Sequence, residues 1–351
     1  MPPPVTAPPK TGAATGATGA YTKLNLVGKG SFGAVFLVRH TKTGGATLIM
    51  KEVQTKGLSQ GEVRATKQEI AVLKHIRHAN IVGYHSTFEI DGLVCILMEY
   101  AAGGDLGRLI HLRKKEEARF TESEIKKYLL QLGSALEYLH SDVHLLHRDV
   151  KPKNVFLSAE GDVRLGDFGL SKVLSKSDGE SEARVGTPLY MSPELAMGEP
   201  YDRSADVWAF AATIYECMSF KPPWSELCTA DGGIEGGMKG LQKALNTKKL
   251  EVDSLTLYSE NLRETLKKLL ARKRKERMTL AQLIAQLTEK PIIPASWGLS
   301  AEAQAALEAA NTLEAQSQPT APPLQPFNTG KSTQRRNSKQ RGSSSDSSSH
   351  H

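Results

Sequence analysis

The first residues whose types and spacing could do chemistry are the glycines of a G-x-G-x-x-G-x-V run, Gly28-Lys29-Gly30-Ser31-Phe32-Gly33-Ala34-Val35. The same glycine spacing opens dinucleotide-binding folds, where the run leads into a helix. Here it leads into Val35-Phe36-Leu37-Val38, an apolar segment that predicts a strand. We therefore interpret the glycines as part of a β-hairpin whose bare backbone amides can approach phosphate groups.

A lysine follows at the end of the third predicted strand, Lys51 in Leu48-Ile49-Met50-Lys51. A lone lysine at a strand end is usually solvated. This one comes after the glycine hairpin and before a predicted helix that carries Glu69. An ion pair between Lys51 and Glu69 would hold the ammonium group on the phosphates of a nucleotide.

Three further runs contain charged residues and stand in a fixed order along the chain. They are His147-Arg148-Asp149-Val150-Lys151-Pro152-Lys153-Asn154, Asp167-Phe168-Gly169 and Ser192-Pro193-Glu194. Each run could occur by chance, but the complete set after the hairpin and the lysine could hardly do so. With this set the chain resembles the eukaryotic protein kinases from about Tyr21 to Leu287. The resemblance implies an α+β, bilobal protein-kinase fold with a β-rich N-lobe and a helical C-lobe.

The resemblance implies ATP-dependent phosphorylation of Ser or Thr residues in protein substrates, with Mg²⁺ as a second cofactor. Such a reaction requires alignment and charge neutralisation more than covalent chemistry. Asp149 would accept or orient the proton of the substrate hydroxyl, and Lys151 would steady the γ-phosphate. Asn154 and Asp167 would hold the metal ion, which prefers oxygen ligands. A lysine at position 151 is typical of Ser/Thr rather than Tyr kinases.

The resemblance also predicts where the nucleotide binds. Val35 would form the roof and Phe156 the floor of the adenine pocket, while Asp105 would bind the ribose. Backbone groups of Glu99 and Ala101 would bind the adenine. The complete predicted nucleotide-binding set is Gly28, Lys29, Gly30, Ser31, Gly33, Val35, Lys51, Glu99, Ala101, Asp105 and Phe156.

Other residues match the family in structural roles. Glu194 and Arg277 should form a buried ion pair that fixes the activation segment to the large lobe. His147 is expected in the core rather than as a base. Asp206 should anchor a stack of four side chains, which are Leu73, Tyr84, His147 and Phe168.

Within the kinases, the chain looks most like the NIMA-related (NEK) kinases. The segments that indicate this are 154–157, 165–170 and 186–194. The resemblance implies a role in the cell cycle or in microtubule and cilium regulation, and a cytoplasmic, cytoskeleton-associated location. Lys153 occupies a position where arginine-directed kinases commonly carry glutamate. We therefore expect an apolar rather than a basic residue upstream of the acceptor.

Regulation is predicted from the activation segment and the tail. The usual phosphoacceptor of the NEK kinases would fall at Ala183, which has no hydroxyl group. Negative charge near Arg148 would then come from phosphorylated Ser181 or from the fixed acids Glu180 and Glu182. In the tail, Arg335-Arg336-Asn337-Ser338 fits a site for an upstream arginine-directed kinase, and the alternative is a purely solubilising tail.

The hydrophobic pattern predicts the elements that position these residues. The N-lobe strands are expected at Leu24–Val27, Ala34–Val38, Thr47–Met50, Ile81–Tyr84 and Leu93–Glu99, and its helix at Glu62–Ile76. Long helices are expected at Thr121–His140, Ser204–Met218, Leu262–Ala271 and Leu280–Leu287. The cleft between the two lobes is the expected ligand site. The stretch 230–240, in the loop after Trp224, contains five glycines and matches no pattern.

Composition sets the domain boundaries. We expect a disordered tail over 1–20, a kinase domain over 21–287, a partly helical extension over 288–316 and a disordered, basic, Ser-rich tail over 317–351. Five bases against one acid from Gln316 onward give that tail +4 of the net charge of +7. The remaining chain is nearly neutral, so nucleic-acid binding is not expected.

Several classes of protein are disfavoured. No apolar run is long enough to span a bilayer, and the first residues do not resemble a secretory signal. Three cysteines without C-x-x-C spacing predict neither a disulfide framework nor a zinc site, in keeping with a reducing cytosol. A pseudokinase scaffold is the main alternative to an active kinase, but every catalytic residue named above is present.

Overall fold

The computed structural model describes residues 20–30, 33–41, 45–90, 92–167, 189–225, 233–248 and 250–288. Within these ranges the side chains of Gly30, Glu62, Ala65, Glu69 and residues 233–237 are not described. The predicted amino-terminal tail up to residue 19, and the predicted extension and tail from residue 289 onward, lie outside the described residues. The predicted activation-segment residues 168–188 also lie outside them.

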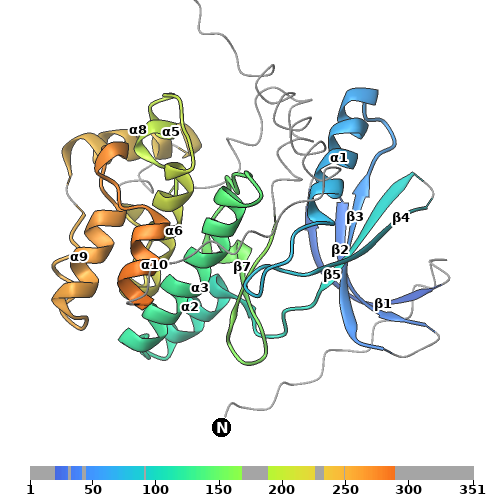
Figure 1. The fold of residues 1–351 in the computed structure, drawn as a ribbon, viewed down its shortest axis with the longest axis horizontal. Helices are drawn as coiled ribbons and strands as arrows, with labels where there is room; N and C mark the ends of the chain where they lie inside the picture. The colour runs from blue at the N-terminus through green and yellow to red at the C-terminus, as the bar shows by residue number, and fades with distance from the viewer. Residues whose placement is uncertain are drawn as a thin grey trace, which may run out of the picture.

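The N-lobe is a five-stranded antiparallel sheet with one helix (Figure 1). The strand order is β1-β2-β3-β5-β4, and the strands are β1 (Tyr21–Gly30), β2 (Gly33–His40), β3 (Thr47–Gln54), β4 (Tyr84–Ile90) and β5 (Leu93–Glu99). The helix α1 (Gln60–Leu73) shares one buried apolar cluster with β3 and β5, to which Val53, Ile70, Leu73, Val94 and Ile96 belong. Its apolar stripe thus covers one face of the sheet.

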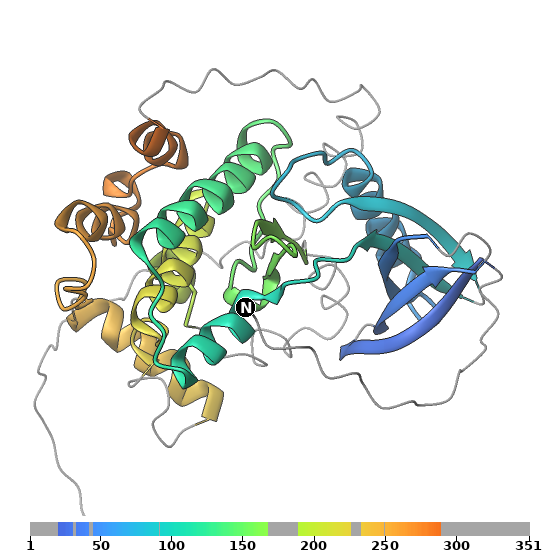
Figure 2. The ribbon, with the colours of Figure 1, turned by 90° about the horizontal axis from the view of Figure 1, so that it is seen from below.

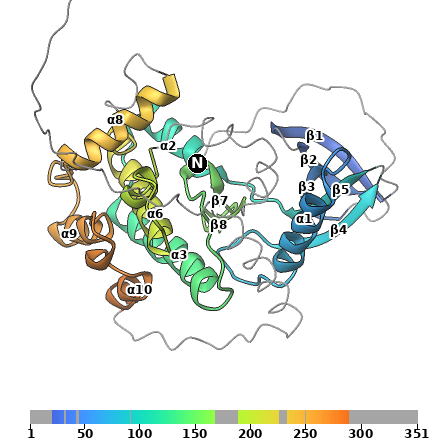
Figure 3. The same cartoon turned by 90° about the horizontal axis from the view of Figure 1, so that it is seen from above.

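The C-lobe is mainly helical and lies at the other end of the molecule (Figure 2). Its helices are α2 (Leu106–Lys115), α3 (Glu122–Ser141), α5 (Pro193–Ala196), α6 (Ser204–Ser219), α8 (Gly233–Thr247), α9 (Glu260–Leu269) and α10 (Leu280–Thr288), with short 3-10 turns at η1 (Pro152–Asn154) and η3 (Arg274–Glu276). A small sheet of β6 (Gly104–Asp105), β7 (Val155–Leu157) and β8 (Val163–Leu165) lies between these helices and the N-lobe (Figure 3). The predicted bilobal α+β kinase fold is confirmed.

Helix α3 shows why the C-lobe helices form where they do. Thr121 caps its first turn in a capping box, because its hydroxyl accepts from the amide of Glu124 and the Glu124 carboxylate accepts from the amide of Thr121. Apolar residues at helical spacing, including Leu129, Leu132 and Leu136, are fully buried in the C-lobe core. The cap at Thr121 and the buried apolar stripe therefore both favour a helix over Glu122–Ser141.

The strand predicted at Ile81–Tyr84 is wrong. Strand β4 begins at Tyr84 and runs to Ile90, while Ile81 makes only an isolated bridge to Leu165. The amide of Val82 donates to the carbonyl of Leu165 at 2.9 Å. The apolar run therefore connects the N-lobe to β8 of the C-lobe instead of joining the N-lobe sheet.

Three helices were missing from the sequence prediction, namely the short α5 and the longer α2 and α8. Residues 233–240, within the glycine-rich stretch, form the first half of α8. Each glycine costs a helix about 1 kcal/mol relative to alanine, but Leu241, Ala244 and Leu245 in the second half are buried. Helix α2 is polar overall and is stabilised by its cap, Asp105, and by the burial of Leu106.

Candidate active site

The carboxylate of Asp149 lies in the loop between α3 and β7, beside two donors from the same loop. Lys151 Nζ lies 2.8 Å and Asn154 Nδ2 2.8 Å from Asp149 Oδ2. Asn154 Nδ2 also donates to the backbone carbonyl of Asp149 at 2.7 Å. Both side-chain contacts use Oδ2, so among the described residues Oδ1 is the oxygen left for a substrate hydroxyl.

A buried carboxylate, Asp206 of α6, holds the start of this loop. Its Oδ2 accepts from the amide of His147 and its Oδ1 from the amide of Arg148, each at 2.8 Å. His140 Nε2 lies 2.8 Å from Oδ2. Burial raises the pKa of Asp206, but these hydrogen bonds and nearby charges outweigh it, so that the pKa lies below its ordinary value. The predicted anchoring role of Asp206 thus acts on the backbone before Asp149.

This anchoring has a conformational reason. Arg148 has a φ of 65°, in the left-handed region. Such a backbone costs a residue with a side chain roughly 1–2 kcal/mol. Two hydrogen bonds to the charged Asp206 carboxylate, at about 1.5–3 kcal/mol each, outweigh this cost. The strained turn lies directly before Asp149.

His147 is a core residue, as predicted. Its side chain is buried, and its Nδ1 accepts from the amide of Asp149 at 3.3 Å. Its Nε2 lies 3.0 Å from the carbonyl of Gly166, so that the neutral ring protonated at Nε2 satisfies both contacts. Burial lowers the pKa of His147, which favours this neutral form.

The structure brings Lys51 to Asp167. Lys51 Nζ lies 3.1 Å from Asp167 Oδ1, although the two residues belong to different lobes. Strand β3 places Lys51 in the middle of the N-lobe sheet, opposite Val35 of β2 and Ile96 of β5. The side chain of Glu69 is outside the described residues, so its ion pair with Lys51 remains a prediction.

The glycine run forms the β1–β2 hairpin, as the sequence predicts. Gly28 pairs with Val35 and Gly30 with Gly33. Gly33 has a φ of 150°, and a Cβ at this position would overlap the carbonyl oxygen of Glu52. A Cβ on Gly28 would have no atom within 4 Å, so the backbone there is open to a ligand. Lys29 is exposed beside it, and Ser31 lies outside the described residues.

The predicted adenosine-binding residues lie where the two lobes connect. Glu99 ends β5, and its carboxylate accepts from the amide of Gly83 at 3.0 Å and from Arg164 Nε at 2.8 Å. Ala101 follows as a buried residue, and Asp105 caps α2 by accepting from the amide of Arg108 at 2.8 Å. The Glu99 side chain therefore stabilises the connection between the lobes, and adenine binding by backbone groups of Glu99 and Ala101 stays a prediction.

Phe156 lies next to these residues in the small sheet. It pairs with Asp105 of β6 and Arg164 of β8. A Cβ on Gly166 would lie 2.9 Å from the Phe156 ring and 2.9 Å from the Val82 side chain. A side chain at position 166, just before Asp167, would therefore require the Phe156 ring or the Val82 side chain to shift.

Two residues at this site were missing from the sequence prediction. Arg164 binds Glu99, and Val82 packs beside Gly166, but neither belongs to a recognised run.

The donor set fits Mg²⁺. Asn154 uses its amide nitrogen to bind Asp149, which leaves its side-chain oxygen as a donor, and Asp167 contributes a carboxylate that is 44% exposed. The amide of Gly166 donates to the carbonyl of Asn154 at 3.0 Å, so the two segments are adjacent. Among the described residues there is no cluster of three His, Cys, Asp or Glu side chains. Mg²⁺ does not require one, because it takes one or two protein ligands together with phosphates and water.

The predicted ion pair of Glu194 and Arg277 is present and buried. Arg277 Nη1 and Nη2 lie 2.8 and 3.0 Å from the two carboxylate oxygens of Glu194. Burial raises the pKa of Glu194, but the hydrogen bonds and charge of Arg277 outweigh it, so that the pKa lies below its ordinary value. The pair connects α5 to the segment before α10 and supports the end of the activation segment.

Comparisons with known proteins agree with this geometry. The protein kinase domain model matches residues 21–288. Serine/threonine-protein kinase Nek1 of Mus musculus is 35% identical over 280 residues, 78% of this chain and 22% of the relative. Nek4 of Mus musculus is 34% identical over 271 residues, 76% of this chain and 32% of the relative.

A third relative comes from fission yeast. G2-specific protein kinase fin1 of Schizosaccharomyces pombe is 37% identical over 223 residues, 58% of this chain and 31% of the relative. The chain therefore spans between about a fifth and a third of the length of these three relatives. No helix among the described residues is both long and apolar enough to cross a membrane. The chain belongs to the protein kinase family, and its kinase domain is of the Nek-like serine/threonine type.

Proposed function

We propose that this chain transfers the γ-phosphoryl group of ATP to Ser or Thr hydroxyls of protein substrates, with Mg²⁺. The observation that carries the proposal is the position of Asp149, whose Oδ2 is held by Lys151 and Asn154 at 2.8 Å while Oδ1 remains for a hydroxyl. The kinase family generally uses ATP and Mg²⁺, and the residues that would hold both are present.

The residues of the site have separate roles in this reaction. Asp149 Oδ1 accepts the hydrogen bond of the acceptor hydroxyl and takes its proton as the hydroxyl oxygen attacks the γ-phosphorus, while the bond from that phosphorus to the bridging oxygen breaks and ADP leaves. The Lys151 ammonium, held beside Asp149, stabilises negative charge on the transferred group. Lys51, which lies 3.1 Å from Asp167, binds the phosphates from the N-lobe side. Asn154 and Asp167 would hold Mg²⁺, which would supply charge neutralisation for the phosphates.

Two features support a preference among substrates. Lys153 is exposed and only four residues after Asp149, where a basic side chain on the substrate would be repelled. No arginine stands at Tyr190 or Met191, where proline-directed kinases typically have one. The substrate is therefore a segment with an apolar residue upstream of the acceptor and no required proline after it.

Regulation belongs to the same proposal. Arg148 directly precedes Asp149, and its backbone amide donates to Asp206. Negative charge near the Arg148 side chain would order the activation segment. Ser181 phosphorylated by an upstream kinase, or the acids Glu180 and Glu182, supply that charge. Ser338 is a second site for an upstream kinase. These four residues lie outside the described part of the chain.

The cellular setting is proposed from the resemblance to the NIMA-related kinases together with the names of the relatives. The fission-yeast relative is named as a G2-specific protein kinase, and several others carry Nek names. We infer a role in the cell cycle or in microtubule and cilium regulation, at a cytoplasmic site associated with the cytoskeleton. Protein substrates are the expected partners, without membrane or nucleic-acid partners.

The proposed function is tested by phosphate transfer. Purified protein is incubated with ATP, MgCl₂ and casein, and the product is hydrolysed for phosphoamino-acid analysis. We expect phosphoserine and phosphothreonine, no phosphotyrosine, and loss of the signal with EDTA. The Lys51→Met variant should fold and lose transfer by several orders of magnitude. Phosphotyrosine alone, or equal transfer by Lys51→Met, would contradict the proposal.

A further inference from the structure

Residues 80–83, between α1 and β4, lie along strand β8 of the C-lobe. The amide of Leu165 donates to the carbonyl of Asn80 at 2.8 Å, and the amide of Val82 donates to the carbonyl of Leu165 at 2.9 Å. Strand β8 ends two residues before Asp167. This segment is therefore bound to the strand that leads to a proposed metal ligand.

One carboxylate joins the same segment to the end of β5 and to β8. Glu99, the last residue of β5, accepts from the amide of Gly83 at Oε2 at 3.0 Å and from Arg164 Nε at Oε1 at 2.8 Å. Its own amide donates to the carbonyl of Gly83 at 2.8 Å. Both carboxylate oxygens of Glu99 are thus used by donors from two other segments.

The Arg164 side chain is not part of the C-lobe core. Val163 and Leu165 on either side of it are fully buried, whereas Arg164 is partly exposed on the other face of β8, as strand alternation requires. Directly opposite Arg164 on β7 is Phe156, the predicted floor of the adenine pocket. Opposite residues of an antiparallel pair share a face, so Arg164 contacts the end of β5 from the same face of the small sheet as Phe156.

We propose that Arg164 is a positioning residue for nucleotide binding. The inference rests on the proposed kinase function. The ion pair of Arg164 with Glu99 fixes strand β8, and with it Asp167, relative to the backbone at Glu99 and Ala101 that we expect to bind adenine. A nucleotide then meets a cleft whose two sides already have the required spacing, and its binding does not have to order them.

The size of the effect follows from the exposure of the pair. The Arg164 and Glu99 side chains are 22% and 35% exposed, so solvent weakens their interaction. Such a pair contributes up to a factor of about five to an equilibrium constant. Without it, the fraction of molecules with the competent cleft falls, and the apparent Kd of the nucleotide rises accordingly. The backbone bonds of residues 80–83 to β8 remain, so the cleft is loosened and not lost.

The test measures nucleotide affinity separately from transfer. The Kd and dissociation rate of a fluorescent ADP analogue with MgCl₂ are measured for the wild type, Arg164→Gln and Arg164→Lys. We expect Arg164→Gln to raise the Kd by up to about fivefold, mainly through faster dissociation. Arg164→Lys should retain most of the affinity, because its ammonium group still pairs with Glu99. In transfer to casein, Arg164→Gln should raise the KM for ATP and leave kcat unchanged, because saturating ATP restores the competent cleft.

A double-mutant cycle assigns the effect to the pair. In the Glu99→Gln background, Arg164→Gln should have no further effect on the Kd, because its partner is already absent. Additive effects on the Kd, or equal losses in Arg164→Gln and Arg164→Lys, would show that the ion pair does not position the nucleotide site.

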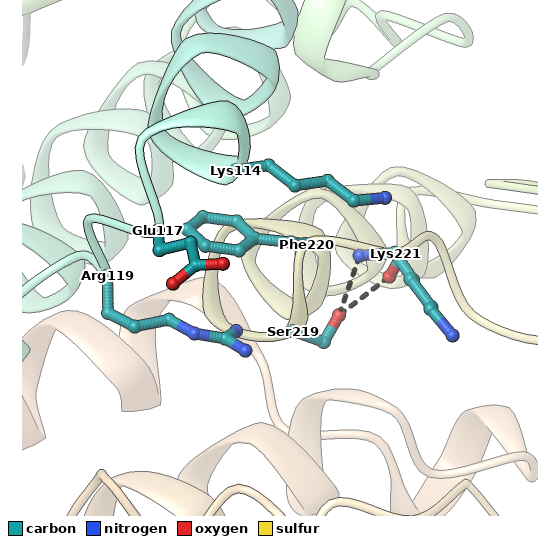
Figure 4. A pocket seen from close by; sticks show the side chains of 6 residues that line it. All are labelled: Lys114, Glu117, Arg119, Ser219, Phe220 and Lys221. Carbon is teal, nitrogen blue, oxygen red and sulfur yellow. Dashed lines mark hydrogen bonds between the residues drawn. The ribbon is translucent and has the colours of Figure 1, made fainter.

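A matched control separates positioning from the loss of any ion pair. Arg113 Nη2 lies 2.6 Å from Glu124 Oε1, and these side chains are 28% and 30% exposed, but both belong to the C-lobe. Arg113 is in the last turn of α2, next to Lys114, which lines a pocket of about 410 Å³ at that end of the helix (Figure 4). Arg113→Gln should therefore leave the Kd and the KM for ATP unchanged.

The outcomes distinguish the two proposals. An unchanged or lower Kd for Arg164→Gln, or an equal rise for Arg113→Gln, would overturn the positioning role and leave the kinase function intact. The expected Kd values, together with no phosphate transfer by the wild type, would instead count against the proposed function and leave the positioning of the nucleotide supported.

Discussion

The Nε2 atom of His147 lies 3.0 Å from the carbonyl oxygen of Gly166, the residue before Asp167. The same ring accepts from the amide of Asp149 at its other nitrogen. One imidazole thus connects the two backbone segments that carry the proposed base and the proposed metal ligand. The relative position of Asp149 and Asp167 depends on this ring remaining neutral.

The His147 ring predicts a pH dependence of stability. Burial lowers its pKa in the folded protein, so between that value and the ordinary value of about 6.5 the unfolded chain binds more protons. The contribution of the neutral His147 ring to the free energy of unfolding is complete above about pH 6.5 and is lost as the pH falls below that value. Urea unfolding of the wild type and of His147→Phe between pH 5 and 7.5 checks this. As the pH falls, we expect the free energy of unfolding to decrease more steeply for the wild type than for the variant. Parallel curves of this free energy against pH would show that His147 does not titrate on unfolding.

The pair of Glu194 and Arg277 predicts an asymmetry between single and double substitutions. Removing one partner leaves a buried charge, at a cost of about 3–5 kcal/mol. Glu194→Gln and Arg277→Met should each reduce the free energy of unfolding by that order, whereas the double variant should recover a large part of it. The measurement is a double-mutant cycle in urea at pH 7. Additive losses in the double variant would exclude a coupled pair.

Lys153 predicts substrate preference. Lys153→Glu should allow peptides with arginine upstream of the acceptor, because it converts repulsion into attraction. A peptide array scored for the wild type and for the variant reads this directly. Lys268→Glu, an exposed substitution in the last turn of α9 and outside the catalytic loop, is the control. A wild-type array dominated by Arg at −2 or by Pro at +1 is incompatible with the proposed preference.

The activation segment predicts partial activity without phosphorylation. A carboxylate has one charge and two oxygens, whereas a phosphate has nearly two charges and three oxygens, so Glu180 and Glu182 should order the segment only in part. Phosphatase-treated protein should retain some activity. Ser181→Ala should lower the maximum, and the double Glu→Gln variant should lose the basal rate. If the double variant keeps its full rate after phosphatase treatment, the acids do not substitute for phosphate.

The sequence predicted the residues that belong to short runs, because their chemistry requires them close together in the chain. Asp149, Lys151 and Asn154 are within six positions, and the structure brings them into contact. The contact of Lys51 with Asp167 follows only from the fold, since 116 positions separate them.

Contacts between isolated residues could not be predicted in this way. Glu99 binds Arg164, and His140 binds Asp206, through side chains that share no local pattern. The segment Ile81–Tyr84 was assigned to a strand because its apolar residues fit one, but their burial is against β8. Apolar periodicity reports that a segment is buried and does not say which element covers it.

The central claim is that the carboxylate of Asp149 acts in phosphoryl transfer and not in nucleotide binding. Single-turnover transfer from ATP to casein, measured together with ATP affinity for the wild type and for Asp149→Asn, tests it directly. We expect unchanged ATP affinity and unfolding temperature in the variant, and a transfer rate lower by several orders of magnitude. A transfer rate close to that of the wild type would contradict the assignment of Asp149 and the proposed function that depends on it.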